Sequence, residues 1–272
     1  MEIMVLIDNI ANKPYIAQHG LSLIIKYNDK KILFDAGQDP FTLRKNLETI
    51  KERDNFDSIV ISHGHYDHTD GLQYFINKRN KSSSDRENKY DIPIYIHPEA
   101  FVDRYSSDKR KYIGINKSLK KHLIKENLIF VENNPYFEGD MIISGKVERI
   151  FPYEEELFYM ITRDNTYKID PVNDDMFIIV DGVVITGCAH SGIINVMEYA
   201  KKINKNKKIR GVIGGFHLMS ASKEYLDKVY NYLSKCDLEL IMPLHCTGVN
   251  AMNLLSTLDG FIYGHVGKIL IL

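Results

Sequence analysis

Apolar residues along the chain recur with two spacings, which together predict a mixed α/β protein. Short apolar runs bounded by turn residues predict buried strands at 3–7, 21–27, 31–35, 58–62, 92–97, 176–180, 183–187, 210–215 and 238–244. Apolar residues at helical spacing predict helices over 40–50, 193–200 and 225–233. Asn28-Asp29 is typical of a tight hairpin turn, and Asp39-Pro40 is typical of a helix start. Strands and helices are therefore mixed along the whole chain.

Two segments depart from this pattern. Residues 78–89 contain no apolar residue and are rich in charge and serine, which predicts a solvated insertion. Residues 98–170 have an irregular pattern with many tyrosines and lysines. The length of 272 residues suits one large unit or two small domains. Because strand patterns resume directly after both segments, we interpret residues 1–272 as a single domain.

Composition narrows the class of protein. Hydrophobic residues make up 44% and charged residues 26%, and the formal net charge is -1, which does not predict a broad nucleic-acid surface. No apolar run approaches the ~18 residues of a membrane span, and the N-terminus lacks the basic start of a signal peptide. Three cysteines cannot form a paired disulfide framework. We therefore expect a cytoplasmic protein without a nucleic-acid or membrane partner; its oligomeric state stays open.

One short segment concentrates chemistry directly after a predicted buried strand. His63, His65, Asp67 and His68 place three imidazoles and a carboxylate within six positions, and Gly64 lets the loop bend closely. Neutral imidazole and carboxylate are ligands for Zn²⁺ and other divalent transition metals. Most isolated histidines in surface loops bind nothing, but four potential ligands in six positions favour a metal site.

Three later histidines also follow predicted strands, where layered folds usually carry polar site residues. His190 lies in TGCAHSG (186–192), His217 in GGFH (214–217) and His245 in PLHCTG (243–248). His97 also ends a strand, but the proline after it suits an ordinary strand terminus. The remaining histidines have no ligand-like neighbours and are left out of the site: His19, His122 and His265.

The segment HGHYDH (63–68) resembles the His-x-His-x-Asp-His signature of the metallo-β-lactamase superfamily, and ILFDAG (32–37) resembles its first motif. The resemblance implies an α+β fold, the four-layer αβ/βα sandwich, with metals at one edge where strand-end loops converge. It implies that Asp35 orients a ligand or the metal loop by hydrogen bonding. The irregular region 98–170 is then expected to cover that edge.

The resemblance also implies a ligand set for two metal ions. His63, His65 and His190 would hold the first ion, and Asp67, His68 and His245 the second. Many members carry Thr-Gly-Asp where this chain has Thr-Gly-Cys, so Cys188 is either an extra thiolate ligand or a small buried residue. Asp174 and Asp175 are fallback ligands, or else part of a solvated turn.

This site predicts a metal-dependent hydrolase that uses a metal-bound hydroxide on a small phosphorylated or ester substrate. We expect two divalent ions, and zinc before manganese or iron. Two such ions lower the pKa of a shared water from ~15.7 to near 7. Asp67 would orient the hydroxide, and His217 would act as the general acid or bind a substrate anion.

Two alternatives stay open. The segments SHGHYDHTDGL, TGCAHSGIINV, IGGFHL and PLHCTG resemble a subgroup that includes the archaeal dihydropterin–ribofuranosylaminobenzene phosphate synthase, which implies a pterin-type condensing transferase with a planar aromatic substrate. Tyrosines within 98–170 suit either stacking on such a ring or ordinary packing. A non-catalytic metal-binding or sensing module is the second alternative, which predicts full metal occupancy without turnover.

Overall fold

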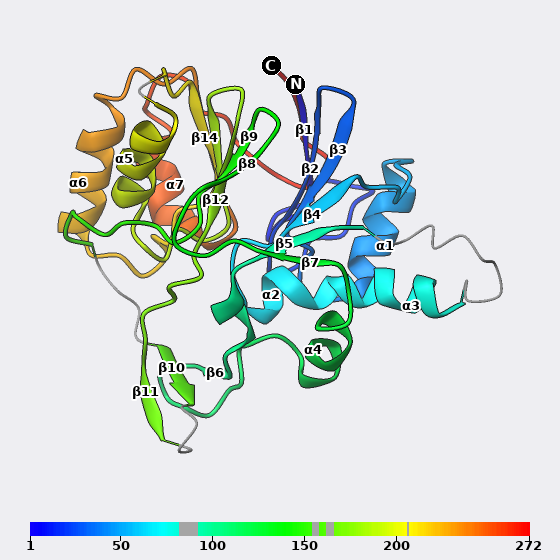
Figure 1. The fold of residues 1–272 in the computed structure, drawn as a ribbon. Coiled ribbons are helices and arrows are strands. Elements are labelled where there is room, and N and C mark those ends of the chain that lie inside the picture. The colour runs from blue at the N-terminus through cyan, green and yellow to red at the C-terminus, as the bar shows by residue number, and fades with distance from the viewer. Residues whose placement is uncertain (82–91, 154–157, 162–165, 206) are drawn as a thin grey trace.

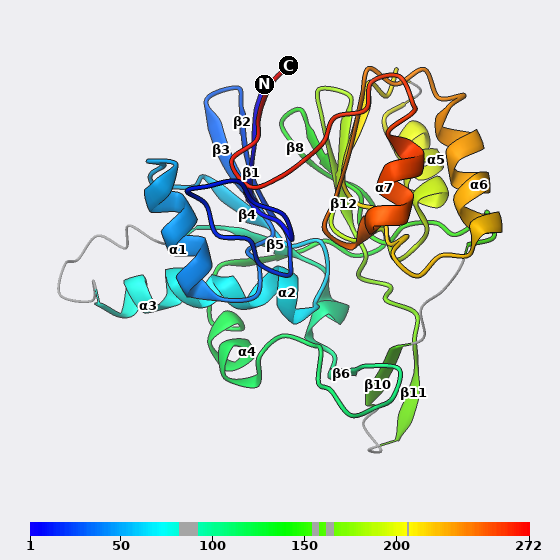
Figure 2. The same cartoon turned by 180° about the vertical axis from the view of Figure 1, so that it is seen from behind.

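Two mixed β-sheets pack face to face, and helices cover the outer face of each (Figure 1). The computed structural model describes residues 1–81, 92–153, 158–161, 166–205 and 207–272. The two termini lie side by side at one edge, where Met1 N donates to Leu272 O over 2.9 Å (Figure 2). The αβ/βα sandwich predicted from the sequence is therefore confirmed.

The first sheet has seven strands in the order β16-β1-β2-β3-β4-β5-β7. Their bounds are β1 (Glu2–Ile7), β2 (Ser22–Tyr27), β3 (Lys30–Phe34), β4 (Ser58–Val60), β5 (Ile94–Ile96), β7 (Leu128–Phe130) and β16 (Ile269–Ile271). Asn28 and Asp29 both have positive φ, at 47° and 59°, which matches the twist of a tight hairpin turn between β2 and β3. Strands β3, β4, β5 and β7 run parallel, so their carboxyl ends meet at one edge.

The second sheet has six strands in the order β15-β14-β13-β12-β9-β8. Their bounds are β8 (Tyr136–Glu138), β9 (Met141–Ile143), β12 (Phe177–Val180), β13 (Val183–Thr186), β14 (Gly211–Gly215) and β15 (Leu240–Leu244). Strands β13, β14 and β15 are parallel to one another. The loops after these three strands therefore lie together at one edge of this sheet.

The helices are short and follow the strands. Their bounds are α1 (Pro40–Thr49), α2 (Tyr66–Thr69), α3 (Gln73–Lys81), α4 (Lys117–Leu123), α5 (Ile193–Ile203), α6 (Lys223–Leu233) and α7 (Val249–Leu255), with short 3₁₀ turns η1 (Asp70–Leu72), η2 (Pro98–Phe101) and η3 (His245–Thr247). Asp39 caps α1 by accepting from the backbone N–H groups of Phe41 and Thr42. In the described residues, no helix has the length and apolar character needed to cross a membrane.

Three apolar clusters hold these layers together. The cluster between the two sheets joins residues such as Val5 and Ile25 of the first sheet to Ile178 and Ile185 of the second. A second cluster packs α5, α6 and α7 onto the second sheet, and a third packs α1 and α3 onto the first. Each sheet is thus buried on both faces, as its continuous apolar strands require.

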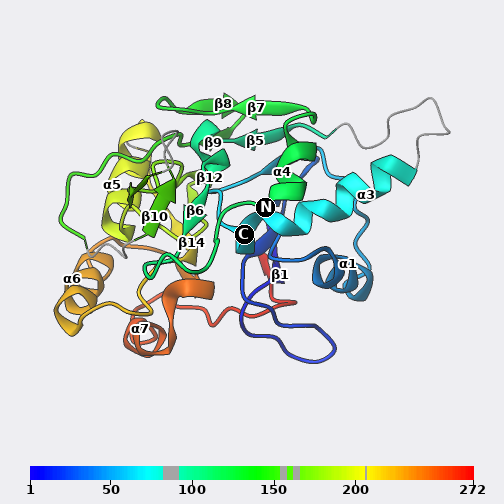
Figure 3. The ribbon, with the colours of Figure 1, turned by 90° about the horizontal axis from the view of Figure 1, so that it is seen from below.

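A third, small sheet consists of β6 (Arg104–Tyr105), β10 (Phe158–Ile161) and β11 (Tyr167–Asp170), and we call this sheet the arm. Figure 1 shows the arm below the two main sheets, and Figure 3 shows it on the side of the second sheet. Only part of the region 98–170 is therefore a cover, because β7, β8 and β9 are strands of the main sheets. Their short apolar segments stand among polar residues, so they do not stand out from the irregular pattern.

The first residues of the insertion predicted over 78–89 are helical. Residues 78–81 complete α3, whose apolar residues Phe75 and Ile76 pack against the first sheet. The other residues of that insertion, 82–89, lie outside the described part of the chain.

Candidate metal centre

The metal loop, residues 63–68, begins just beyond β4 and enters α2. Asp35, at the end of the adjacent parallel strand β3, accepts from Ser62 N and from Ser62 Oγ, each over 2.7 Å. Position 64 has no room for a side chain, since a Cβ there would lie 2.1 Å from Ala100 O. Two neighbouring strand ends therefore fix where the loop starts, with Asp35 in the orienting position that the resemblance implied.

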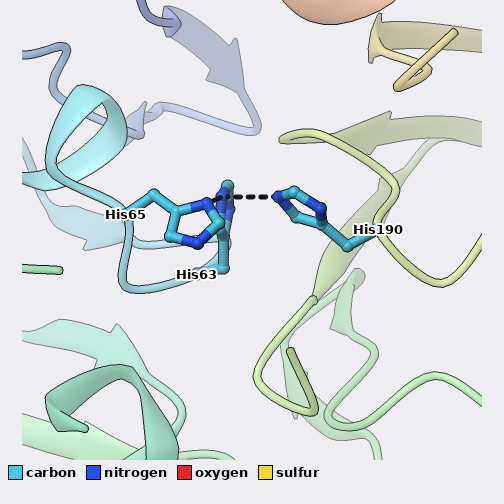
Figure 4. Close-up of side chains that lie close together, drawn as sticks. All are labelled: His63, His65 and His190. Carbon is cyan, nitrogen blue, oxygen red and sulfur yellow. Dashed lines mark hydrogen bonds between the residues drawn. The ribbon is translucent and has the colours of Figure 1, made fainter. Parts of the chain in front are cut away.

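His63, His65 and His190 converge from the two sheets (Figure 4). His63 Nε2 lies 3.0 Å from His65 Nδ1 and 3.2 Å from His190 Nε2. The first two histidines follow β4 of the first sheet, and His190 follows β13 of the second. The sandwich thus brings together three imidazoles that are up to 127 positions apart in the sequence.

These imidazoles are held neutral. Burial and the neighbouring histidines lower the pKa of His63 and of His190 well below the ordinary value. Burial, with Arg104 nearby, lowers the pKa of His65 to about 3. His65 Nε2 is buried and has no hydrogen-bond partner among the described residues. Three neutral imidazoles whose nitrogen atoms face one another at 3.0 and 3.2 Å fit a bound cation well.

Asp67, His68 and His245 form a second group beside the first. Asp67 Oδ2 lies 3.2 Å from His245 Nε2 and 3.7 Å from His68 Nε2. On the far side of each ring, His68 Nδ1 lies 2.6 Å from Asp35 Oδ2, and His245 Nδ1 lies 3.0 Å from Asn9 Oδ1. Such partners leave the Nε2 atoms directed at the shared space, as metal-binding histidines require.

The two charged members of this group stabilise each other. Burial raises the pKa of Asp67, but the three histidines at positions 68, 19 and 245 outweigh it and hold that pKa well below the usual range. Burial lowers the pKa of His68, but the carboxylates of Asp35 and Asp67 outweigh it and raise that pKa to about 9. Two carboxylates, Asp35 and Asp67, face the single positive charge of His68, so the net charge here is negative and favours a cation.

Cys188 contacts the candidate ligands, whereas Asp174 and Asp175 contact backbone N–H groups. Cys188 Sγ lies 3.2 Å from His68 Nε2, and the donor atoms of Cys188, His68 and His63 all lie within 4.8 Å of one another. Asp174 accepts from Gly64 N over 2.7 Å and Asp175 accepts from Ser191 N over 2.8 Å. Both aspartates are buried, so the solvated turn considered for them is wrong: each anchors a loop that carries candidate ligands.

His217 lies beside His190, with ring centroids 4.3 Å apart and its backbone at a φ of 51°. Its ring nitrogen lies within 4.8 Å of the donor atoms of Cys188 and His190, so it is close to the candidate ligands. His97 instead caps η2, where its Nδ1 accepts from Glu99 N over 3.1 Å, as a strand terminus would.

Sequence patterns missed two residues of the site. His19 Nε2 lies 3.2 Å from Asp67 Oδ2, and its ring centroid is 4.9 Å from that of His245. Cys246 joins Cys188 and His245 in a group whose donor atoms lie within 4.8 Å. His19 stands in an irregular loop before β2, and only the position of Cys246 beside His245 offered a signal.

A cavity of about 620 Å³ opens onto both groups. Its lining includes His65, Asp67, His190, His217 and His245 on the floor, and Ser106, Lys111, Ile113 and Phe158 from the region 98–170. The Phe158 ring centroid lies 5.1 Å from that of His65 and 5.4 Å from that of His190. The arm thus contributes an apolar wall to a pocket whose floor is polar.

Comparisons with known proteins agree with this arrangement. A sequence model of the metallo-β-lactamase superfamily matches residues 16–115. The chain is 47% identical over 269 residues to an uncharacterized protein of Methanocaldococcus jannaschii, a match that covers 98% of this chain and 99% of the relative. It is 28% identical over 290 residues to the 7,8-dihydropterin-6-methyl-4-(β-D-ribofuranosyl)-aminobenzene-5′-phosphate synthase of the same organism, covering 95% of this chain and 92% of that enzyme.

Solved structures show the same likeness. The crystal structure of Tm1679, a metal-dependent hydrolase of the β-lactamase superfamily, superposes with a TM-score of 0.83 at 27% identity and covers 100% of this chain and 99% of its own. A diphosphatase of the PhnP family superposes with a TM-score of 0.60 at 14% identity, covering 99% of this chain and 96% of its own, which shows a shared fold.

Proposed function

Because the chain belongs to the metallo-β-lactamase superfamily, we propose that it is a metal-dependent hydrolase with two divalent ions and a small phosphorylated or ester substrate. The observation that carries the proposal is the convergence of His63, His65 and His190 beside Asp67, His68 and His245 under one cavity. When bound, two divalent ions would lower the pKa of a shared water to near 7 and polarise a substrate oxygen.

The chain's own residues supply orientation and proton transfer. Asp67 lies beside His19 and His245 and lines the cavity, so we propose that its carboxylate orients an attacking water. His217 lines the same cavity, close to His190, and is the group that we propose gives a proton to the leaving group. Phe158 excludes water from the side of the arm.

The test is turnover by the full chain loaded in turn with Zn²⁺, Mn²⁺ and Fe²⁺. Bis(4-nitrophenyl) phosphate, 4-nitrophenyl phosphate and 4-nitrophenyl acetate report hydrolysis by release of 4-nitrophenol. We expect His63→Ala to lose at least about a hundredfold in kcat/KM, because it removes a proposed ligand. His122→Ala is the matched control, since His122 is exposed on α4, where its Nδ1 lies 2.8 Å from Ser118 O. Fully metallated protein that hydrolyses none of the three esters would contradict the proposal.

A pterin-type condensing transferase is the second candidate, favoured by the 28% identity to the dihydropterin synthase over 95% of the chain. The aromatic wall at Phe158 would suit a planar ring. Metal-loaded protein would be incubated with a dihydropterin pyrophosphate and an aryl-amine nucleophile, and the products separated by chromatography. A coupled pterin–aryl product supports the transferase, whereas ester hydrolysis without coupling rules it out.

A further inference from the structure

Lys111 is the only lysine or arginine among the described residues that line the cavity. The lining holds a single carboxylate, Asp67, which His19 and His245 already contact. Within the described part of the chain, Lys111 Nζ makes no ion pair with a carboxylate. The pocket therefore holds one lysine side chain that the proposed hydrolysis does not use.

The backbone of Lys111 is held in a tight loop. Ser106 N donates to Lys111 O over 2.9 Å, and Lys111 N donates to Ser106 Oγ over 3.1 Å. Ser106 Oγ in turn donates to Asp108 Oδ1 over 2.6 Å. These bonds fix where the side chain starts, so less conformational entropy is lost when the ammonium group meets a ligand.

The ammonium group is directed at the metal loop. Lys111 Nζ donates to Tyr66 Oη over 2.8 Å and lies 4.5 Å from the centroid of the Tyr66 ring. Tyr66 stands between His65 and Asp67, and its backbone N–H donates to Ile113 O over 3.0 Å. The loop that carries Lys111 and the loop that carries the candidate ligands are therefore joined at both backbone and side-chain level.

We propose that Lys111 and the Tyr66 hydroxyl form an anion subsite for a phosphate group of the substrate that is not the group being cleaved. An ammonium group has three N–H donors, of which Tyr66 takes one, and the tyrosine hydroxyl still has its own proton to donate. Three donors at one place suit the several oxygens of a phosphate better than the two of a carboxylate. The substrate would then carry two anionic groups, one over the metal centre and one at Lys111.

This inference depends on the proposed function in one respect, which is that the substrate binds in this cavity. The test is isothermal titration of the metal-loaded full chain with propane-1,3-diphosphonate and with propylphosphonate, which share a carbon chain but differ by one anionic group. Neither has a bond that hydrolysis would cleave. In the wild-type protein we expect the diphosphonate to bind more tightly.

Lys111→Met is expected to weaken diphosphonate binding at least tenfold and to leave propylphosphonate binding within about twofold, because it removes only the second contact. Tyr66→Phe should weaken diphosphonate binding several-fold. Lys117→Met is the matched control, since Lys117 Nζ also lies over a tyrosine ring, 5.2 Å from the Tyr112 centroid, but does not line the cavity. Equal losses in both lysine variants, or no loss in Lys111→Met, would overturn the subsite.

Failure of the two proposals is distinguishable. If the subsite is wrong, ester hydrolysis persists while Lys111→Met binds both phosphonates as the wild type does. If the hydrolase is wrong, no ester is cleaved while the diphosphonate still loses affinity in Lys111→Met.

Discussion

Arg104 and Asp174 form a buried ion pair, with Arg104 Nη1 2.9 Å from Asp174 Oδ2. Arg104 lies on β6 and also donates to Asp170 at the end of β11, so it holds two strands of the arm. Asp174 Oδ2 also accepts from Gly64 N in the metal loop. One carboxylate therefore joins the arm to the loop that carries His63 and His65.

Arg104→Met is expected to destabilise the fold by about 3–5 kcal/mol, because it leaves two buried carboxylates without their positive partner. Urea unfolding of the metal-free protein measures this loss. Arg44→Met is the control. Arg44 is exposed and its ion pair with Glu48, at 3.7 Å, lies in solvent, so the urea midpoint of this variant should equal that of the wild type. An Arg104→Met midpoint equal to that of the wild type would show that the pair does not stabilise the protein.

Asp35→Asn is expected to weaken metal binding about 10- to 100-fold, because the neutral amide no longer stabilises or orients His68 as a carboxylate does. Asparagine tolerates the positive φ of 57° at this position, so the backbone should be kept. Competition with a chromogenic chelator measures the affinity, and circular dichroism checks the fold. Unchanged affinity in a folded variant argues against this role for Asp35.

Cys188 is expected to bind metal as a thiolate, because its Sγ lies 3.2 Å from His68 Nε2 beside the second group. Co²⁺-substituted protein should show sulfur-to-cobalt charge-transfer absorption in the near ultraviolet, and Cys188→Ala should lose it. Cys236→Ala is the control, because Cys236 lies on the outer helical layer and contacts Tyr232. Absorption that survives in Cys188→Ala would assign the sulfur ligand elsewhere.

Asp54 is expected to stabilise the protein at neutral pH and not in acid. Burial raises its pKa, but the Lys78 ammonium and the Tyr74 hydroxyl outweigh burial and lower it below the ordinary value. A lowered carboxyl pKa contributes stability above the unfolded-state pKa of about 4, and this contribution is lost as the pH falls through the folded-state value.

Asp54→Asn should therefore be less stable than the wild type by about 1 kcal/mol at pH 7, with the difference shrinking below about pH 4. Urea unfolding at pH 7, 5 and 3 measures the trend. A difference that stays constant from pH 7 to pH 3 would show that the Asp54 charge is not its source.

Local patterns in the sequence already determined much of this protein. The main strands with continuous apolar runs and the helices α1, α5 and α6 were predictable. A strand buried on both faces appears as an apolar run, and a helix buried on one face has apolar residues at a spacing of about 3.6. The loop from His63 to His68 was predictable too, since its ligand types are adjacent in the chain. The strands β7, β8 and β9 were not, because their short apolar segments stand among the polar residues of the irregular region 98–170.

Tertiary structure alone decided which distant residues meet. His19 reaches Asp67, and Lys111 reaches Tyr66, only because the loop before β2, the metal loop after β4 and the region 98–170 pack at one edge. Asp174 looked like a residue of a polar turn, and the fold buries it by pairing it with Arg104, 70 positions away. Periodicity reports which side of an element is buried, whereas the partner of a buried charge depends on how whole layers pack.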